Sequence, residues 1–169
     1  MKLLNRWIVG ALLFGQTLTA QAGTNGWTLI GWNDLGMHCM DGSDYSLFSV
    51  LPPFNTFYAQ LVYRGKLVTN STGIQITYEA VADPDGSFNS TSRDKINFWD
   101  YAGVLYGATP AGDSGLAGYA MPGTLNTPQA MGFSAGKWVV EGLPITPYDN
   151  ATNKNFYPLM RLVARSNGV

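Results

Sequence analysis

One short segment carries the side chains of this sequence that are best suited to chemistry. It contains the only histidine and the only cysteine of the chain, which are neighbours with a methionine on each side. Cu(I) favours thiolate, thioether and imidazole ligands, and nearby carboxylates can add oxygen ligands. The segment therefore predicts a site for copper or another transition metal. Its candidate ligands are Met37, His38, Cys39, Met40, Asp41 and Asp44.

The spacing of these residues limits the kind of metal site. Neighbouring residues of a strand point to opposite faces, so His38 and Cys39 converge only if Gly36 ends the strand and a loop follows. The chain lacks the second histidine of a blue-copper site and the Cys-x-x-Cys-His motif of covalent haem, so both are excluded. Zinc would need two aspartates beside the histidine and cysteine, an unusual set. An inert buried thiol beside a packed histidine is the favoured interpretation of this pair, and the metal site is the alternative.

The same segment is a poor nucleophilic site. A catalytic thiol needs a base within hydrogen-bond reach, and Cys–His pairs usually come together from distant parts of a chain. Here the only histidine is adjacent to the cysteine, and no complete catalytic motif occurs elsewhere. We therefore assign no catalytic residues, and the sequence favours a binding or structural protein over an enzyme.

The N-terminal residues 1–22 have the features of a secretory signal peptide. Lys2 and Arg6 accompany a short apolar run, and Ala20-Gln21-Ala22 is a small-residue cleavage site. The run is shorter than the roughly 20 residues that span a bilayer, so no membrane span is expected after signal removal. We expect an exported protein, periplasmic or extracellular, with a single domain over residues 23–169. Ser166 to Val169 is a turn signal without a following strand, so the domain either ends at a sheet edge or is truncated.

The composition limits the classes of partner and indicates what stabilises the fold. The formal net charge is −1, 12% of residues are charged, and no basic cluster occurs, which excludes nucleic acid as a partner. A single cysteine cannot form an internal disulfide, so stability must come from packing. The 46% hydrophobic content with 20 glycines is typical of a folded domain with many turns.

Alternating apolar and polar residues predict β-structure along most of the chain. Ala59, Leu61 and Tyr63 should share one face of a strand, and one face of another should carry Ile74, Ile76, Tyr78 and Ala80. The predicted strands are 27–32, 56–63, 74–80, 138–141 and 157–165, with a hairpin turn at residues 64–66. The fold class expected is all-β, an Ig-like or jelly-roll β-sandwich with one short helix and long loops.

The short helix is expected over residues 95–106. Ile96, Trp99 and Val104 recur at roughly helical spacing, and either Ser92 or Asp94 can cap the first turn. The next stretch, residues 107–136, consists mostly of small and polar residues and contains one charge, Asp113. Connections of this length often carry function, so it is a candidate binding loop.

Two aspartate-rich turns offer oxygen ligands for Ca²⁺. They are Asp41-Gly42-Ser43-Asp44 and Asp83-Pro84-Asp85-Gly86. Neither matches the twelve-residue EF-hand loop, and an ordinary tight turn is the favoured interpretation.

The aromatic content suggests another class of function. Trp27, Trp32, Trp99 and Trp138, with nine tyrosines, are compatible with a module that stacks sugars or other flat ligands. A row of exposed, coplanar rings would favour that function. Rings that fill the core are the commoner alternative.

Several motifs resemble one group of proteins. These motifs are GWNDLGMHCMD at 31–41, FSVLPPFNT at 48–56, NFWDY at 97–101, PITPYD at 144–149 and YPLMR at 157–161. The chain is similar in them to uncharacterised exported bacterial proteins. The resemblance implies export, a longer chain in some members, and an association of some members with electron transfer or the cell surface. It implies no cofactor for this chain.

Together these observations favour an exported, non-catalytic binding or structural β-domain. One alternative is a copper-like metal-binding or redox-associated periplasmic protein that uses the Met37 to Asp44 segment. The other is a carbohydrate- or surface-binding module. The partner classes that follow are a surface, a polysaccharide or an electron-transfer protein.

Overall fold

A computed structural model describes residues 26–34, 54–93, 97–122, 128–146, 148–150, 153–155 and 157–167. Antiparallel strands dominate these residues and one short helix accompanies them, which confirms the predicted all-β class. The elements are β1 (Trp27–Asn33), β2 (Asn55–Tyr63), β3 (Lys66–Leu67), β4 (Ile74–Val81), α1 (Phe98–Tyr106), β5 (Gln129–Ala130), β6 (Gly132–Ser134), β7 (Lys137–Leu143), β8 (Tyr148–Asp149), β9 (Asn153–Lys154) and β10 (Leu159–Ser166).

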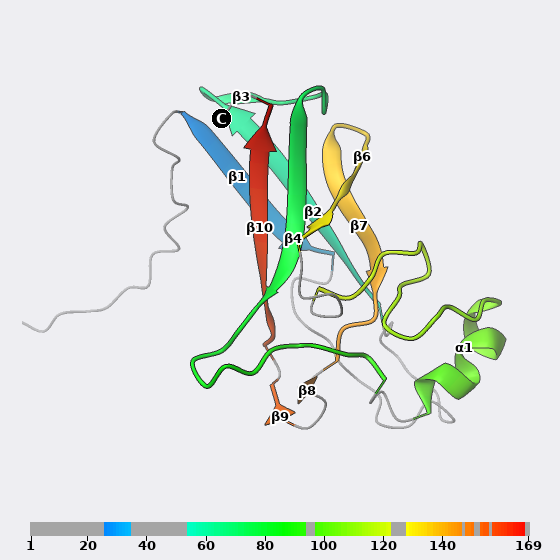
Figure 1. The fold of residues 1–169 in the computed structure, drawn as a ribbon. Coiled ribbons are helices and arrows are strands. Elements are labelled where there is room, and N and C mark those ends of the chain that lie inside the picture. Colours follow the sequence, from blue (N-terminus) through cyan, green and yellow to red (C-terminus); the bar gives the residue numbers. More distant parts are fainter. Residues whose placement is uncertain are drawn as a thin grey trace, which may run out of the picture.

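The strands form two facing sheets and a small separate pair. The larger sheet has the order β1-β2-β7-β6, with β3 paired to β2, and the smaller has the order β10-β4-β5. In Figure 1, β4 and β10 cross in front of β1 and β2 as the second layer of a sandwich. β8 and β9 pair with each other at one end of the molecule (Figure 1).

Alternation explains how these strands build a core. Along β2 every second residue from Asn55 to Leu61 is buried, and along β4 Ile76 and Tyr78 are fully buried. The predicted faces of both strands are confirmed at these residues, whereas Tyr63, Ile74 and Ala80 are half-buried. The β2–β3 hairpin is also confirmed: Arg64 and Gly65 adopt φ angles of 47° and 76°, the left-handed values that a two-residue hairpin turn requires.

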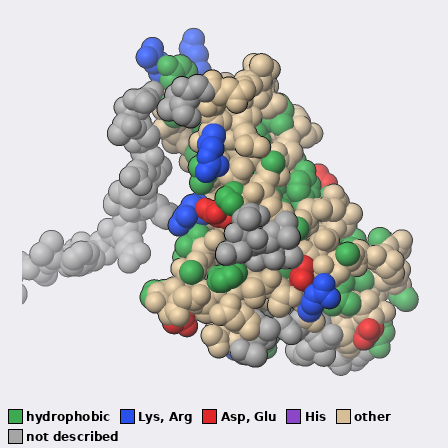
Figure 2. Space-filling model, viewed as in Figure 1, with side chains coloured by type: hydrophobic (Ala, Val, Ile, Leu, Met, Phe, Trp, Pro, Cys, Tyr) green, Lys and Arg blue, Asp and Glu red, His purple; other side chains and the backbone are tan. Residues whose placement is uncertain are grey.

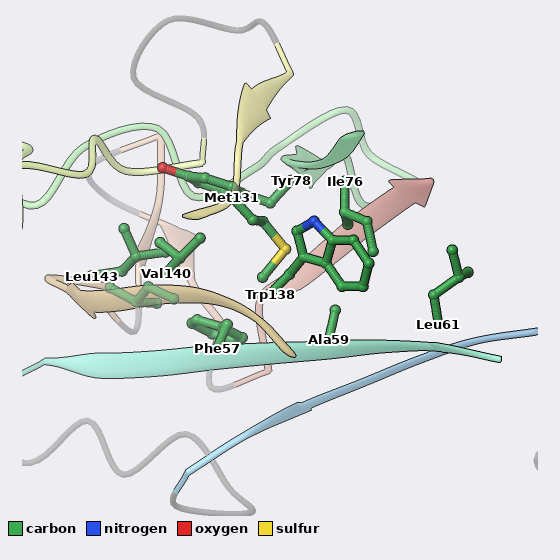
Figure 3. Close-up of a cluster of buried hydrophobic side chains, with 10 residues drawn as sticks. Phe57, Ala59, Leu61, Ile76, Tyr78, Met131, Trp138, Val140 and Leu143 are labelled. Carbon is green, nitrogen blue, oxygen red and sulfur yellow. The ribbon is translucent and has the colours of Figure 1, made fainter. Parts of the chain in front are cut away.

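Trp138 lies at the centre of the core. It is 1% exposed and packs between the sheets, close to Met131, Ala59 and Ile76 (Figure 3). The ring of Phe133 meets it edge-on, with 4.8 Å between ring centroids. A buried aromatic of this size removes a large apolar area from water, which makes it a main source of the sandwich's stability.

The helix lies beyond the sheets, at the end where β2 begins and β7 ends (Figure 1). It buries Phe98 and Ala102, whereas Val104 is 85% exposed, so the expected apolar face is wrong at that residue. The predicted cap at Ser92 is also wrong, because its hydroxyl bonds to the Asp113 carboxylate; Asp94 and Ile96 lie outside the described residues. In the part of the chain described here, no helix has the length and apolarity to cross a membrane.

Candidate functional site

The predicted metal ligands all lie outside the described residues. They are Met37, His38, Cys39, Met40, Asp41 and Asp44. The structure does show where their segment leaves and rejoins the larger sheet. The N–H of Asp34 donates to the Thr56 carbonyl at 3.0 Å, and the N–H of Thr56 donates to the Asp34 carboxylate at 3.2 Å. We call these two hydrogen bonds the Asp34–Thr56 clasp. It brings the two ends of segment 35–53 together.

An open cleft lies directly at this clasp. Its volume is about 370 Å³, at the small end of the range of about 300–1,000 Å³ typical of ligand pockets. We call it the Tyr106 cleft. Its lining comes from the end of β1, the start of β2, β7, α1 and the loop after α1, and includes Asp34, Phe54, Tyr58, Tyr106, Leu116 and Glu141.

One wall of the Tyr106 cleft is aromatic. Phe54 contacts Phe98 and Tyr106 edge-on, at centroid distances of 5.3 and 5.4 Å, so α1 is joined to the start of β2 by rings. Tyr106 is 37% exposed and Leu116 is 45% exposed. Partial burial raises the pKa of the Tyr106 hydroxyl, so this group stays protonated at neutral pH and can donate a hydrogen bond.

The other wall carries two carboxylates. Asp34 and Glu141 both line the cleft and both are exposed. An ionised carboxylate accepts hydrogen bonds from hydroxyl or amine donors and disfavours a negatively charged ligand. The cleft therefore combines apolar ring faces with acidic acceptors.

The ring of Tyr58, which lines the cleft, is in contact with neighbours on β1 and β7. Trp32 stacks on Tyr58 across β1 and β2, with 5.5 Å between centroids and 29° between planes. The Lys137 ammonium lies over the Tyr58 ring at 4.1 Å from its centroid. The Tyr58 ring is thus covered by Trp32 and Lys137. Trp138 is buried in the core. Trp32, Tyr58 and Trp138 therefore do not build a flat, exposed aromatic platform.

A second groove runs between the edge strands β1 and β10. Its volume is about 380 Å³, and its lining is mainly apolar, including Trp32, Leu159 and Leu162. It lacks the carboxylates of the Tyr106 cleft. Lys and Arg side chains form no continuous basic patch on the face shown in Figure 2.

Asp113, the one charge of the predicted binding loop, has a structural role. It is 7% exposed, and its carboxylate accepts hydrogen bonds from Thr91, from the N–H and hydroxyl of Ser92 and from the Arg93 guanidinium, at 2.6 to 3.1 Å. Burial alone would raise its pKa, but these hydrogen bonds together lower it. The loop nevertheless contributes Leu116 and Ala117 to the Tyr106 cleft.

The turn at residues 83–86 lies beside a second buried aspartate. Gly86 donates its N–H to the Asp83 carbonyl at 2.8 Å, which confirms the predicted tight turn. Asn155 joins Asp83 to Asp149 by hydrogen bonds from its side-chain amide. Among the residues with described placement, no three His, Cys, Asp or Glu side chains are grouped in a way that holds a metal ion.

Sequence reasoning missed the main residues of the Tyr106 cleft. The exposed position of Glu141 could have been predicted from the alternation along β7, in which Trp138 and Val140 face inward. Tyr106 had no such signal, because it meets Phe54 only through the packing of α1 on the end of β2. No family model, curated protein or solved structure matches this chain, so the resemblance to exported bacterial proteins stays a prediction.

Proposed function

We propose that this protein is an exported, non-catalytic binding module that holds a carbohydrate in the Tyr106 cleft. One observation carries the proposal: exposed ring surface and two carboxylates, from segments far apart in the sequence, converge on one open cleft at the Asp34–Thr56 clasp. Convergence of a few polar groups on an apolar pocket is the usual form of a binding site for small molecules.

Carbohydrate fits both walls of the cleft. A sugar ring has an apolar face of C–H groups, which packs on aromatic side chains such as Tyr106, and a rim of hydroxyl groups. Those hydroxyls donate to the carboxylates of Asp34 and Glu141, and hydrogen bonds to charged groups are stronger than those between neutral groups. Because the acidic wall repels anions, the proposed ligand is a neutral sugar chain.

A purely structural role explains the exposed side chains less well. Tyr106 and Leu116 remain open to solvent at the cleft although the sandwich buries its own core aromatics efficiently. Apolar surface that stays exposed beside convergent polar groups commonly marks an interaction site.

The test compares binding to insoluble neutral and anionic polysaccharides by the wild-type protein and by matched variants. We expect retention on a neutral polymer. Tyr106→Ala should weaken binding about two- to tenfold, the effect of losing one aromatic contact. Glu141→Gln should weaken it by roughly tenfold or more, because a hydrogen bond to a charged group is lost.

Tyr157→Ala serves as the matched control, since Tyr157 is 76% exposed and does not line the cleft. It should bind like the wild type. Equal effects of the Tyr106 and Tyr157 substitutions, or no retention on any neutral polymer, would contradict the proposed site. Release of soluble sugar during incubation would contradict the non-catalytic role.

A further inference from the structure

Strand β1 lies at one edge of the larger sheet, and among the described strands only β2 pairs with it. The carbonyl of Gly26 and the N–H of Asp34, which flank β1, bond to β2 and to its neighbouring turn. Because these bonds alternate along an antiparallel pair, the even-numbered residues between them also turn their backbone groups toward β2. The N–H and C=O groups of Leu29 and Gly31 therefore point away from β2, and no described backbone group pairs with them.

This edge lacks the features that usually keep other chains away from a sheet. Natural edge strands are very short, or carry charges, proline or a bulge. The other edge of the larger sheet, β6, has three residues, and β5 of the smaller sheet has two. The remaining edge, β10, carries Arg161 and Arg165. In contrast, β1 has seven residues without a charge, and it pairs with β2 in an unbroken register.

Apolar side chains accompany the free backbone groups of β1. On its outer face Ile30 is 46% exposed and Trp32 is 39% exposed. On its inner side runs the apolar groove of about 380 Å³ between β1 and β10. A Cβ built at Gly31 would lie 2.5 Å from Cδ1 of Leu162, so Leu162 fills the groove beside this glycine. Exposed apolar surface along an unpaired edge is typical of a strand that another strand can join.

We propose that β1 pairs antiparallel with β1 of a second copy of this chain, about a two-fold axis at Ile30. In this register the strand meets itself along its whole length, so Trp27 of one copy faces Asn33 of the other. The free backbone groups of Leu29 bond to those of Gly31 in the second copy. Each Leu29 side chain then lies opposite a glycine, which leaves room for it over the groove.

Charge complementarity supports this occupant and this register. Asp34 of one copy lies opposite Gly26 of the other, and the stem of Arg64 covers that glycine, with Cγ 3.2 Å from a Cβ built there. Asp34 and Arg64 are both exposed. The Asp34 carboxylate accepts one described hydrogen bond, from the Thr56 N–H, and has lone pairs for more. The two-fold axis therefore places two acidic groups beside two basic groups, with no charge from β1 between them.

The mass of the purified protein tests the proposal. The contact involves one strand of each copy, so we expect a weak dimer with a dissociation constant of about 10–100 µM. Sedimentation equilibrium at protein concentrations that span this range should show monomer and dimer. Ile30→Lys should weaken association by about tenfold or more, because two ammonium groups then face each other at the axis.

Leu67→Lys is the matched control, since Leu67 is 45% exposed on β3 and lies outside the proposed contact. It should associate like the wild type. Arg64→Glu should weaken the dimer about two- to tenfold by placing two like charges together, whereas Lys66→Glu in the same hairpin should not. Thermal unfolding of each variant checks that the monomer is folded.

A disulfide tests the register. The two Ile30 residues form a non-hydrogen-bonded pair across the axis, and their Cα separation of about 4.5 Å permits a disulfide. In a Cys39→Ser background, Ile30→Cys should therefore give a covalent dimer under mild oxidation, whereas Leu67→Cys should not.

A monomer at every concentration would overturn the proposal, as would equal effects of the lysine substitutions at Ile30 and Leu67. A dimer that is not crosslinked through position 30 would also overturn it, because the contact would then lie elsewhere. Ile30 and Arg64 do not line the Tyr106 cleft, and these measurements involve no sugar. Their outcome is therefore independent of the proposed carbohydrate binding.

Discussion

Asp113 fixes the loop after α1 to the segment that precedes the helix. Its carboxylate is surrounded by donors from Thr91, Ser92 and Arg93, and the Trp99 indole N–H donates to the Ser92 carbonyl at 3.0 Å. The bonds to Asp113 connect residues 20 to 22 positions apart. They hold the helix and the loop in the relative position that forms one side of the Tyr106 cleft.

We predict that Asp113→Asn destabilises the protein by about 2–3 kcal/mol at pH 7, because hydrogen bonds to a buried charge are lost. The pKa of Asp113 is lower in the folded than in the unfolded chain. The stabilisation that the ionised Asp113 carboxylate provides is therefore complete above its pKa in the unfolded chain, and it is lost as the pH falls through its pKa in the folded chain.

Urea unfolding at a series of acidic pH values measures this dependence. The free energy of unfolding of the wild type should approach that of the variant as the pH falls. A constant difference would refute the linkage. Asp100→Asn should cost less than about 1 kcal/mol.

The metal hypothesis for segment 37–44 also belongs at the residue scale. Elemental analysis of the protein after copper loading and dialysis should find one bound ion if the histidine, cysteine and methionines converge. His38→Ala and Cys39→Ser should each reduce retained copper, because each removes a ligand. Met160→Leu, whose side chain packs against the core, is the control and should retain the metal. No retained copper together with an unreactive Cys39 would leave a packing role.

At the scale of elements, the loop after α1 packs directly on β7. A Cβ built at Gly115 would collide with the backbone carbonyl of Gly142, and Gly115 immediately precedes Leu116 of the cleft. Gly115→Ala should therefore cost about 1–3 kcal/mol from overpacking and also weaken ligand binding. Gly136→Ala is the comparison: its φ of 77° strains an alanine, but the surrounding space is open. It should leave binding unchanged; equal loss of binding in both variants would contradict the positioning role.

The elements differ in how far their sequences determine them. β4 was predictable because its apolar residues alternate and turn residues stand at both of its ends. In the structure, β10 pairs with β4 along its whole length. α1 was only partly predictable. Its buried face is set by Phe98 and Ala102 meeting Phe54, a contact between distant segments that helical spacing alone does not reveal.

At the scale of the whole molecule, the fold class follows from local patterns, but the functional surfaces do not. Hydrophobic alternation indicates which side of each strand is buried, whereas the Tyr106 cleft arises where two strands, the helix and the loop after it meet. The Asp83 turn was recognisable from its residues; its partner Asp149 was not, because nothing in a single sequence shows which distant carboxylate approaches it.

The Asp34–Thr56 clasp has a consequence for how this protein can be altered. Since both junctions of the intervening 35–53 stretch are held by the sandwich itself, its length adds little entropic penalty, about 0.6 kcal/mol for each doubling. We therefore expect peptide insertions of varied length between the two junctions to leave the sandwich folded. The Asp34–Thr56 clasp thus marks a position where the chain should tolerate changes in length.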